Sequence, residues 1–283
     1  MIKIICKENN KLLKYLTNNE GLNFNKIWAL FRAKNIKING KRAKSDDSVS
    51  VGDEVVLFCK DNYFFNIEKI FEDENVLIVS KPKKLEVISE TKNISLINIL
   101  CSSGTSNLFC VHRLDFNTEG IVVFAKNIVA KNILDNCFKT RQIEKKYITI
   151  CKNIPSKSEI LFKDYLTKEN SFVKISSKKT PLSKEVLTKC EIMKTTGNFS
   201  LLKISLLTGR THQIRAHLAF HKLFVLGDDK YGDFNENKKL NLSSQILRCI
   251  ELSFPAMPKP LNNLSGKTFC LDYSDILSFF ETL

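Results

Sequence analysis

Short apolar segments of two different periods, mixed in no regular order, constrain the fold of this chain most strongly. Strand-like runs occupy residues 75–80, 122–124, 147–151 and 200–206. A helical period appears over residues 130–138. Because strands and helices do not alternate as regular βαβ units, the pattern predicts an α+β fold with a mixed sheet rather than a doubly wound parallel one.

The first 60 residues differ in charge from the rest and predict a small unit of their own. They hold twelve basic and six acidic side chains, a large share of the whole-chain net charge of +14. The predicted elements are helices over 12–16 and 25–34, a strand over 36–41 that runs into an Asn39-Gly40 turn, and a strand over 54–58. A polar start at Asp61 predicts a linker over 61–70, which leaves 71–283 for a larger domain.

The basic excess indicates a polyanionic partner, because lysine and arginine gain free energy by releasing counterions from phosphates. A codon bias that favours lysine gives the same excess, and composition alone does not separate the two explanations. An RNA or another phosphate-rich partner is therefore a hypothesis that the motifs have to support.

Cysteine spacing and hydropathy exclude several classes of protein. Nine cysteines are present and none forms a CxxC pair, so a zinc ribbon and a thioredoxin-type site are excluded. Scattered thiols fit a reducing cytosol. The first residues hold no apolar run of signal-peptide length, and no stretch approaches a membrane span. We expect a soluble, cytoplasmic protein with no membrane partner.

A polar cluster stands directly before a hydrophobic strand at residues 111–124. Asp115 follows His112 and Arg113, whose positive charge would favour an ionised carboxylate. A loop at the edge of a rigid sheet can expose a reactive side chain and still hold it in place. Taken alone, however, the segment favours a structural interpretation in which Asp115 only organises the turn before the strand.

A second polar segment, residues 207–219, passes from a glycine turn into a predicted helix. Thr211 is the expected N-cap, and Arg210 lies at the helix N-terminus, where backbone amides favour an anion. Arg215 and Leu218 would share one face. So many polar side chains are costly to bury unless they are paired, so a charged group is expected against them.

Both segments resemble the signatures of the RluA-type pseudouridine synthases. The text "HRLDFNTEG" at 112–120 is similar to the family's HRLD-x-x-T-x-G, and "GRTHQIRAH" at 209–217 is similar to its G-R-T-H-Q-I-R-x-H. Residues 145–147 resemble the family's K-x-Y, and residues 227–232 its G-D-x-x-Y-G. The text "IKINGKRAKSDDSVSVGDEVVLF", from Ile36 onward, resembles the S4-like RNA-binding domain that many members carry in front.

The resemblance implies an isomerase that converts uridine to pseudouridine in RNA. Its fold would be a mainly antiparallel mixed sheet with flanking helices, preceded by a small α/β S4-like domain. Asp115 would be the nucleophile, Tyr147 would stack on the target base, and Arg215 would form an ion pair with Asp115. Substrate contacts are expected from His112, Arg113, Arg210 and Ile214 and, in the front domain, from Lys37, Lys41 and Arg42.

Moving uracil from an N–C to a C–C glycosidic bond is redox-neutral, so no cofactor and no metal are expected. Members with this front domain mostly modify large-subunit ribosomal RNA, which the resemblance implies as the partner of a monomeric enzyme; other relatives act on transfer RNA. One departure matters for the chemistry. Glu119 stands where the family usually has serine, and a second carboxylate would raise the pKa of Asp115 if both face the pocket.

Two other classes of function remain as alternatives. A metal hydrolase is suggested by His217 and His221, four residues apart, but Leu218 stands where the zincin pattern needs glutamate, and no third ligand lies nearby in sequence. A non-catalytic RNA-binding or ribosome-assembly factor would explain the charge equally well. It would not require Asp115, Tyr147 and Arg215 together.

Overall fold

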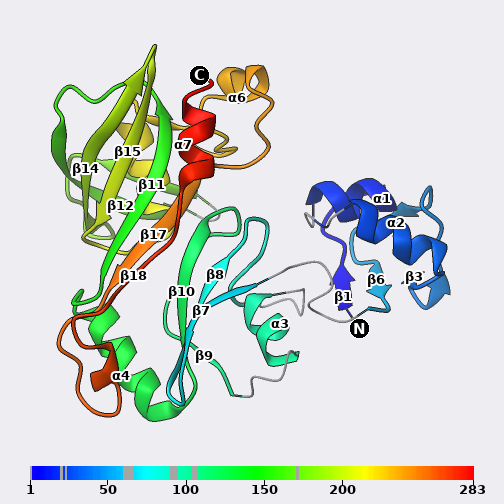
Figure 1. The fold of residues 1–283 in the computed structure, drawn as a ribbon. Coiled ribbons are helices and arrows are strands. Elements are labelled where there is room, and N and C mark those ends of the chain that lie inside the picture. Colours follow the sequence, from blue (N-terminus) through cyan, green and yellow to red (C-terminus); the bar gives the residue numbers. More distant parts are fainter. Residues whose placement is uncertain are drawn as a thin grey trace. The chain divides into compact units, whose positions relative to one another are not determined.

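The computed structural model describes residues 2–19, 22, 24–59, 67–89, 95–102, 107–169 and 172–283, which divide into two compact units (Figure 1). The first unit contains Met1–Phe116 and Val123–Ile128, and the second contains Asn117–Val122 and Val129–Leu283. Strand β10 (Glu119–Ala125) is therefore divided between them by residue range. The boundary predicted at 61–70 lies within the first unit, so the predicted division into domains stays a prediction.

The first unit begins with a small α/β assembly. Its elements are β1 (Ile2–Ile5), β2 (Asn10–Lys11), α1 (Leu12–Lys14), a π-helical turn (Tyr15–Asn19), α2 (Phe24–Arg32), β3 (Ile36–Ile38), β4 (Lys41–Arg42), β5 (Ser48–Val49) and β6 (Glu54–Leu57). The strands form an antiparallel sheet in the order β1-β6-β3-β4 and a separate β2-β5 pair. A hydrophobic core that includes Ile4, Leu16 and Ile27 lies entirely within this assembly.

The elements predicted for residues 1–60 are confirmed with small shifts in their ends. Asn39 and Gly40 have φ angles of 48° and 80°, the left-handed values that a two-residue hairpin turn requires. The turn joins β3 to β4, with Ile38 opposite Lys41.

The rest of the first unit contains β7 (Glu68–Glu72), β8 (Val76–Lys81), α3 (Leu96–Ser102) and β9 (Phe109–Cys110). Strand β7 pairs antiparallel with β8, and β9 pairs antiparallel with the end of β10. Residues 68–70 thus belong to a strand, because Glu68 and Lys69 pair with Ser80 and Val79, and the predicted linker ends too late. Its residues 61–66 lie outside the described part of the chain.

The second unit is built on long antiparallel strands. Its elements are α4 (Ile128–Lys139), β11 (Glu144–Lys152), β12 (Glu159–Glu169), β13 (Phe172–Ser176), β14 (Lys184–Thr196), β15 (Phe199–Leu206), α5 (Gln213–Phe220), β16 (Phe224–Val225), α6 (Phe234–Lys239), β17 (Leu247–Ser253), a 3₁₀ turn (Asn262–Leu264), β18 (Thr268–Cys270) and α7 (Ser274–Phe280). Its sheet runs β13-β12-β14-β15-β11-β17-β10, with β16 beside β11 and β18 beside β17 (Figure 1).

The sheet is mixed, because β10 pairs with β17 in parallel while the neighbouring pairs are antiparallel. The predicted α+β class with a mainly antiparallel sheet is therefore confirmed. Gly120 lies at the parallel pairing with φ 120°, and a Cβ there would come within 2.2 Å of the Cys249 carbonyl oxygen. This close approach explains why a glycine ends the first motif.

Helices cover the sheet of the second unit at two places. Ala216 on α5 packs in a cluster with Val173 and Val186, whereas Ile276 and Phe280 on α7 pack with residues of β11 and β15. Neither these helices nor any other helix in the described ranges is long and apolar enough to cross a membrane.

Candidate active site

Asp115 is half-buried in an irregular segment between β9 and β10, and the backbone is held on both sides of it. Before it, the His112 Nε2 atom accepts a hydrogen bond of 3.0 Å from the Val123 backbone N–H. After it, the Phe116 carbonyl oxygen accepts from the Leu85 N–H at 3.2 Å and from Lys81 Nζ at 3.1 Å. The loop therefore has a fixed path although it lacks regular structure.

Lys81 is a buried lysine whose ammonium group donates hydrogen bonds to backbone carbonyl oxygens. Its Nζ donates to Pro82 at 2.8 Å, to Leu85 at 2.7 Å and to Phe116 at 3.1 Å, and the residue is fully buried. The sequence predicted a strand over 75–80 and gave no role to the lysine that follows it. A lysine that ends a continuously apolar strand was the available signal, because such a cation is rarely buried without partners.

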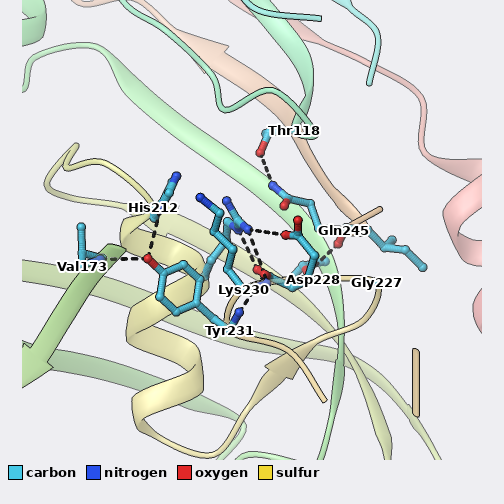
Figure 2. Close-up of polar contacts among 12 residues, drawn as sticks. Thr118, Val173, His212, Gly227, Asp228, Lys230, Tyr231 and Gln245 are labelled. Carbon is cyan, nitrogen blue, oxygen red and sulfur yellow. Dashed lines mark hydrogen bonds and ion pairs between the residues drawn. The ribbon is translucent and has the colours of Figure 1, made fainter. Parts of the chain in front are cut away.

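Other residues of the first motif also have defined partners. Thr118 is buried, and its Oγ1 accepts a hydrogen bond of 2.7 Å from Gln245 Nε2 (Figure 2). The Glu119 carboxylate forms an ion pair of 2.8 Å with Arg248, which also binds Asp275. The additional carboxylate that the sequence introduces is therefore balanced by a guanidinium group.

Helix α5 begins two residues later than Thr211, so the predicted N-cap is wrong. The N-cap is His212, in the left-handed conformation with φ 51°, and it makes no side-chain capping bond. The cause is Gln213, whose Oε1 accepts hydrogen bonds from the Arg210 N–H at 3.1 Å and from Thr208 Oγ1 at 2.8 Å. The Gln213 side chain therefore accepts the backbone hydrogen bond before the helix that the Thr211 side chain was expected to accept.

Arg215 is buried on α5 and is paired with acidic residues of the turn at residues 227–232, called here the Gly-Asp turn. A charged group against this helix was expected from the sequence. Its Nε and Nη2 donate to the two carboxylate oxygens of Asp228 at 2.6 and 2.9 Å, and Nη2 lies 3.3 Å from Asp229 (Figure 2). The guanidinium carbon lies 5.4 Å from the centre of the Tyr231 ring. This bidentate geometry fixes the plane of the guanidinium group.

The Gly-Asp turn is itself held by several side chains. Asn237 accepts from the Gly227 N–H at 2.7 Å and donates to the Asp228 carbonyl at 2.9 Å. The Tyr231 hydroxyl accepts from the Val173 N–H at 2.9 Å and lies 3.0 Å from His212 Nδ1 (Figure 2). The sequence analysis identified this motif without assigning these supporting roles, because the partners come from other segments.

Tyr147 lies in β11 opposite Ile204 on one side and Cys249 on the other, and only 5% of the residue is exposed. Burial raises the pKa of the Cys249 thiol to about 12 and lowers the pKa of the Lys145 ammonium group.

The predicted site residues are shared between the two units. His112, Arg113 and Asp115 belong to the first unit, and Tyr147, Arg210, Ile214 and Arg215 belong to the second. Within the second unit Arg210 is exposed and Ile214 is buried. The predicted ion pair between Asp115 and Arg215, and the roles assigned to the individual residues, stay predictions.

The basic residues predicted to bind RNA lie on an exposed hairpin. Lys37 and Arg42 stand directly opposite each other on β3 and β4, and Lys41 is next to them. Like charges in opposite positions are destabilising, although Lys37 also lies over the Phe58 ring, with its Nζ 5.3 Å from the ring centre. A bound anion would remove that repulsion.

Comparison with known proteins assigns the family. The sequence profile of the RNA pseudouridylate synthase family matches residues 75–220, which include Asp115, Tyr147 and Arg215. An RNA pseudouridine synthase of Mycoplasma capricolum is 29% identical, with 94% of this chain and 96% of the relative covered. Ribosomal large subunit pseudouridine synthase C of Buchnera aphidicola is 30% identical, with coverage of 82% and 81%.

Among solved structures, human RNA pseudouridylate synthase domain containing 4 has a similar fold. It aligns with a TM-score of 0.61 at 22% identity and covers 76% of this chain and 90% of its own. With the match to more than half of its length, this chain belongs to the RNA pseudouridylate synthase family, and it is an isomerase that acts on RNA.

Proposed function

We propose that this chain isomerises specific uridines of large-subunit ribosomal RNA to pseudouridine, with Asp115 as its essential carboxylate. The observation that carries the proposal is the loop around Asp115. Its backbone is anchored by Lys81 and by His112, and this arrangement suits a reactive group that must be held without being fully buried.

In this reaction the uracil base is detached from the ribose, rotated and reattached through a different ring atom. The N1–C1′ bond of uridine breaks, a C5–C1′ bond forms, and the proton lost from C5 is balanced by the one gained at N1. In our proposal Asp115 assists by attack on the sugar or on the base. Removing the base from its stack costs a few kcal/mol, which stacking on Tyr147 offsets in part. Arg215, oriented by Asp228, supplies a fixed cation for the Asp115 carboxylate.

Two observations favour ribosomal RNA as the substrate. The Buchnera relative is named for the large ribosomal subunit. The front assembly, which we propose to be an S4-like RNA-binding domain, has Lys37, Lys41 and Arg42 on an exposed hairpin, where they are accessible for phosphate contacts to a folded RNA. We further propose that the enzyme acts as a monomer in the cytoplasm.

The test is a chemical map of pseudouridine in ribosomal and transfer RNA from a strain that lacks this protein. We expect sites to disappear from large-subunit ribosomal RNA and to return with the wild-type chain but not with Asp115→Asn. Loss of sites from transfer RNA alone would refute the substrate. If the map is unchanged and the purified protein converts neither RNA, the proposed activity is wrong. The alternative, a non-catalytic RNA-binding or ribosome-assembly factor, would then be favoured.

A further inference from the structure

One carboxylate and two imidazoles converge in the second unit, and none of the three belongs to the proposed catalytic residues. Asp164 on β12 accepts hydrogen bonds at a single oxygen, Oδ2, from His217 Nε2 at 3.0 Å and from His221 Nε2 at 2.7 Å. The three atoms lie within 4.8 Å of one another. Asp164 and His217 are buried, and 29% of the His221 side chain is exposed.

The sequence argument against a metal was that no third ligand stands near the two histidines. The fold supplies one from 53 residues before His217, because β12 packs beside α5. His217 and His221 are four residues apart, which places both imidazoles on one side of the last turn of α5. That spacing is the one by which helical histidines share a zinc ion.

We propose that Asp164, His217 and His221 bind a divalent transition-metal ion of the Zn²⁺ type. Two imidazoles and one carboxylate are a ligand set that such ions accept, with water at the fourth position. The half-exposed edge of His221 gives the ion and that water a route to solvent. The site is separate from the proposed reaction, and no step of that reaction passes through it.

The charge balance of the cluster supports the proposal. Only 6% of the Asp164 side chain is exposed, and in the described part of the chain its side-chain partners are the two imidazoles alone. A buried carboxylate is costly unless it is paired with a cation or coordinates a metal, and a divalent cation at this oxygen would remove that cost.

The surrounding side chains already orient both rings. His217 Nδ1 lies 2.9 Å from Thr188 Oγ1, the kind of second hydrogen bond that metal-binding histidines make. The His221 ring stacks on Phe162 at 3.9 Å with an angle of 17° between the planes. Ligands of a tetrahedral zinc ion stand roughly 3.3 Å apart. The contacts of Asp164 with His217 and His221, at 3.0 and 2.7 Å, would open by about 0.3 and 0.6 Å to admit the ion.

Bound metal would fasten α5 to β12, and α5 also carries Arg215. Metal binding should therefore raise the temperature at which the enzyme unfolds. At a free zinc concentration about 100 times the dissociation constant, we expect an increase of about 5 °C.

The experiment is a titration of the chelator-treated full chain with Co²⁺, followed by its visible d–d absorption and by displacement with Zn²⁺. The exposed thiols of Cys101 and Cys270 are first replaced by serine, because thiolates also bind these ions. We expect one equivalent to bind and His221→Ala to weaken binding at least about tenfold. Lys163→Ala, which removes an exposed side chain next to Asp164 on β12, is the matched control and should bind normally.

Asp164→Asn is the second variant, because it keeps the side-chain shape and removes the charge. Circular dichroism shows whether each variant is folded. The proposal is wrong if the protein without Cys101 and Cys270 binds no Co²⁺, or if folded His221→Ala and Asp164→Asn bind as tightly as the parent. Binding that disappears with the two cysteines is adventitious thiolate binding and also overturns it. Asp115→Asn should bind Co²⁺ normally, so a failure of the proposed function would leave this result intact.

Discussion

Two aspartates from two motifs have opposite surroundings. Asp228 is buried, and its oxygens accept two hydrogen bonds from Arg215 and two from the backbone N–H groups of Lys230 and Tyr231. Asp115 is half-buried, and what the structure fixes around it is the backbone of its neighbours His112 and Phe116. The first carboxylate holds a turn against a helix, whereas the second is, in our proposal, the group that reacts.

The sharpest difference should appear in the stability of Asp228→Asn. This change removes the bidentate acidic partner of the buried Arg215, and breaking a buried ion pair typically costs about 3–5 kcal/mol of unfolding free energy. Urea denaturation measures it. Asp229→Asn is the matched control, because that side chain is 61% exposed and its contact with Arg215 is longer, so its effect should stay below about 1 kcal/mol. Equal effects of the two changes would show that Asp228 has no special structural role.

Lys81→Met tests whether the path of the loop matters for Asp115. Losing the ammonium group removes one hydrogen bond from each of three carbonyl oxygens, of which that of Phe116 keeps its bond from the Leu85 N–H, and should cost about 1–3 kcal/mol of unfolding free energy. Displacement of the loop should also slow pseudouridine formation by about tenfold or more. Lys131→Met, which removes only a surface pair with Asp135, serves as the control. If Lys81→Met is less stable but forms pseudouridine at the wild-type rate, the path of the loop does not matter for catalysis.

The basic hairpin should affect RNA affinity and not the rate of the bound complex. If Lys37 and Arg42 each neutralise one phosphate, replacing both by alanine should reduce the slope of log affinity against log salt by about 1.5. Filter binding over a range of salt concentrations measures this slope. Lys3→Ala, which removes a lysine paired with Glu54 in the same assembly, should leave it unchanged. An unaltered slope in the double variant would place the main phosphate contacts elsewhere.

The smallest effect concerns buried thiols in the second unit. Burial raises the pKa of Cys190 from 9.0 to about 12. As the pH rises above 9, the unfolded chain loses this proton while the folded chain keeps it, so the free energy of unfolding should fall over this range. Urea denaturation at a series of pH values tests the sign. Cys190→Ala should have a shallower decline than the parent, and an identical decline would contradict the assignment.

Local patterns predicted the elements, and long-range partners escaped prediction. The Asn39-Gly40 hairpin and the strands at β10 and β11 follow from neighbouring residues, so the sequence was sufficient for them. The partner of Arg215 lies 13 residues away, and the contact of His217 with Asp164 spans 53 residues. The Thr211 cap failed for a related reason, because Gln213 folds back on the turn and takes over its bonds.

The rate of pseudouridine formation by Asp115→Asn, with enzyme in excess over a ribosomal RNA fragment, tests the central claim most directly. The account predicts a rate at least about a thousandfold below wild type, while the free energy of unfolding changes by less than about 0.5 kcal/mol. A folded Asp115→Asn protein that converts uridine at the wild-type rate would contradict it.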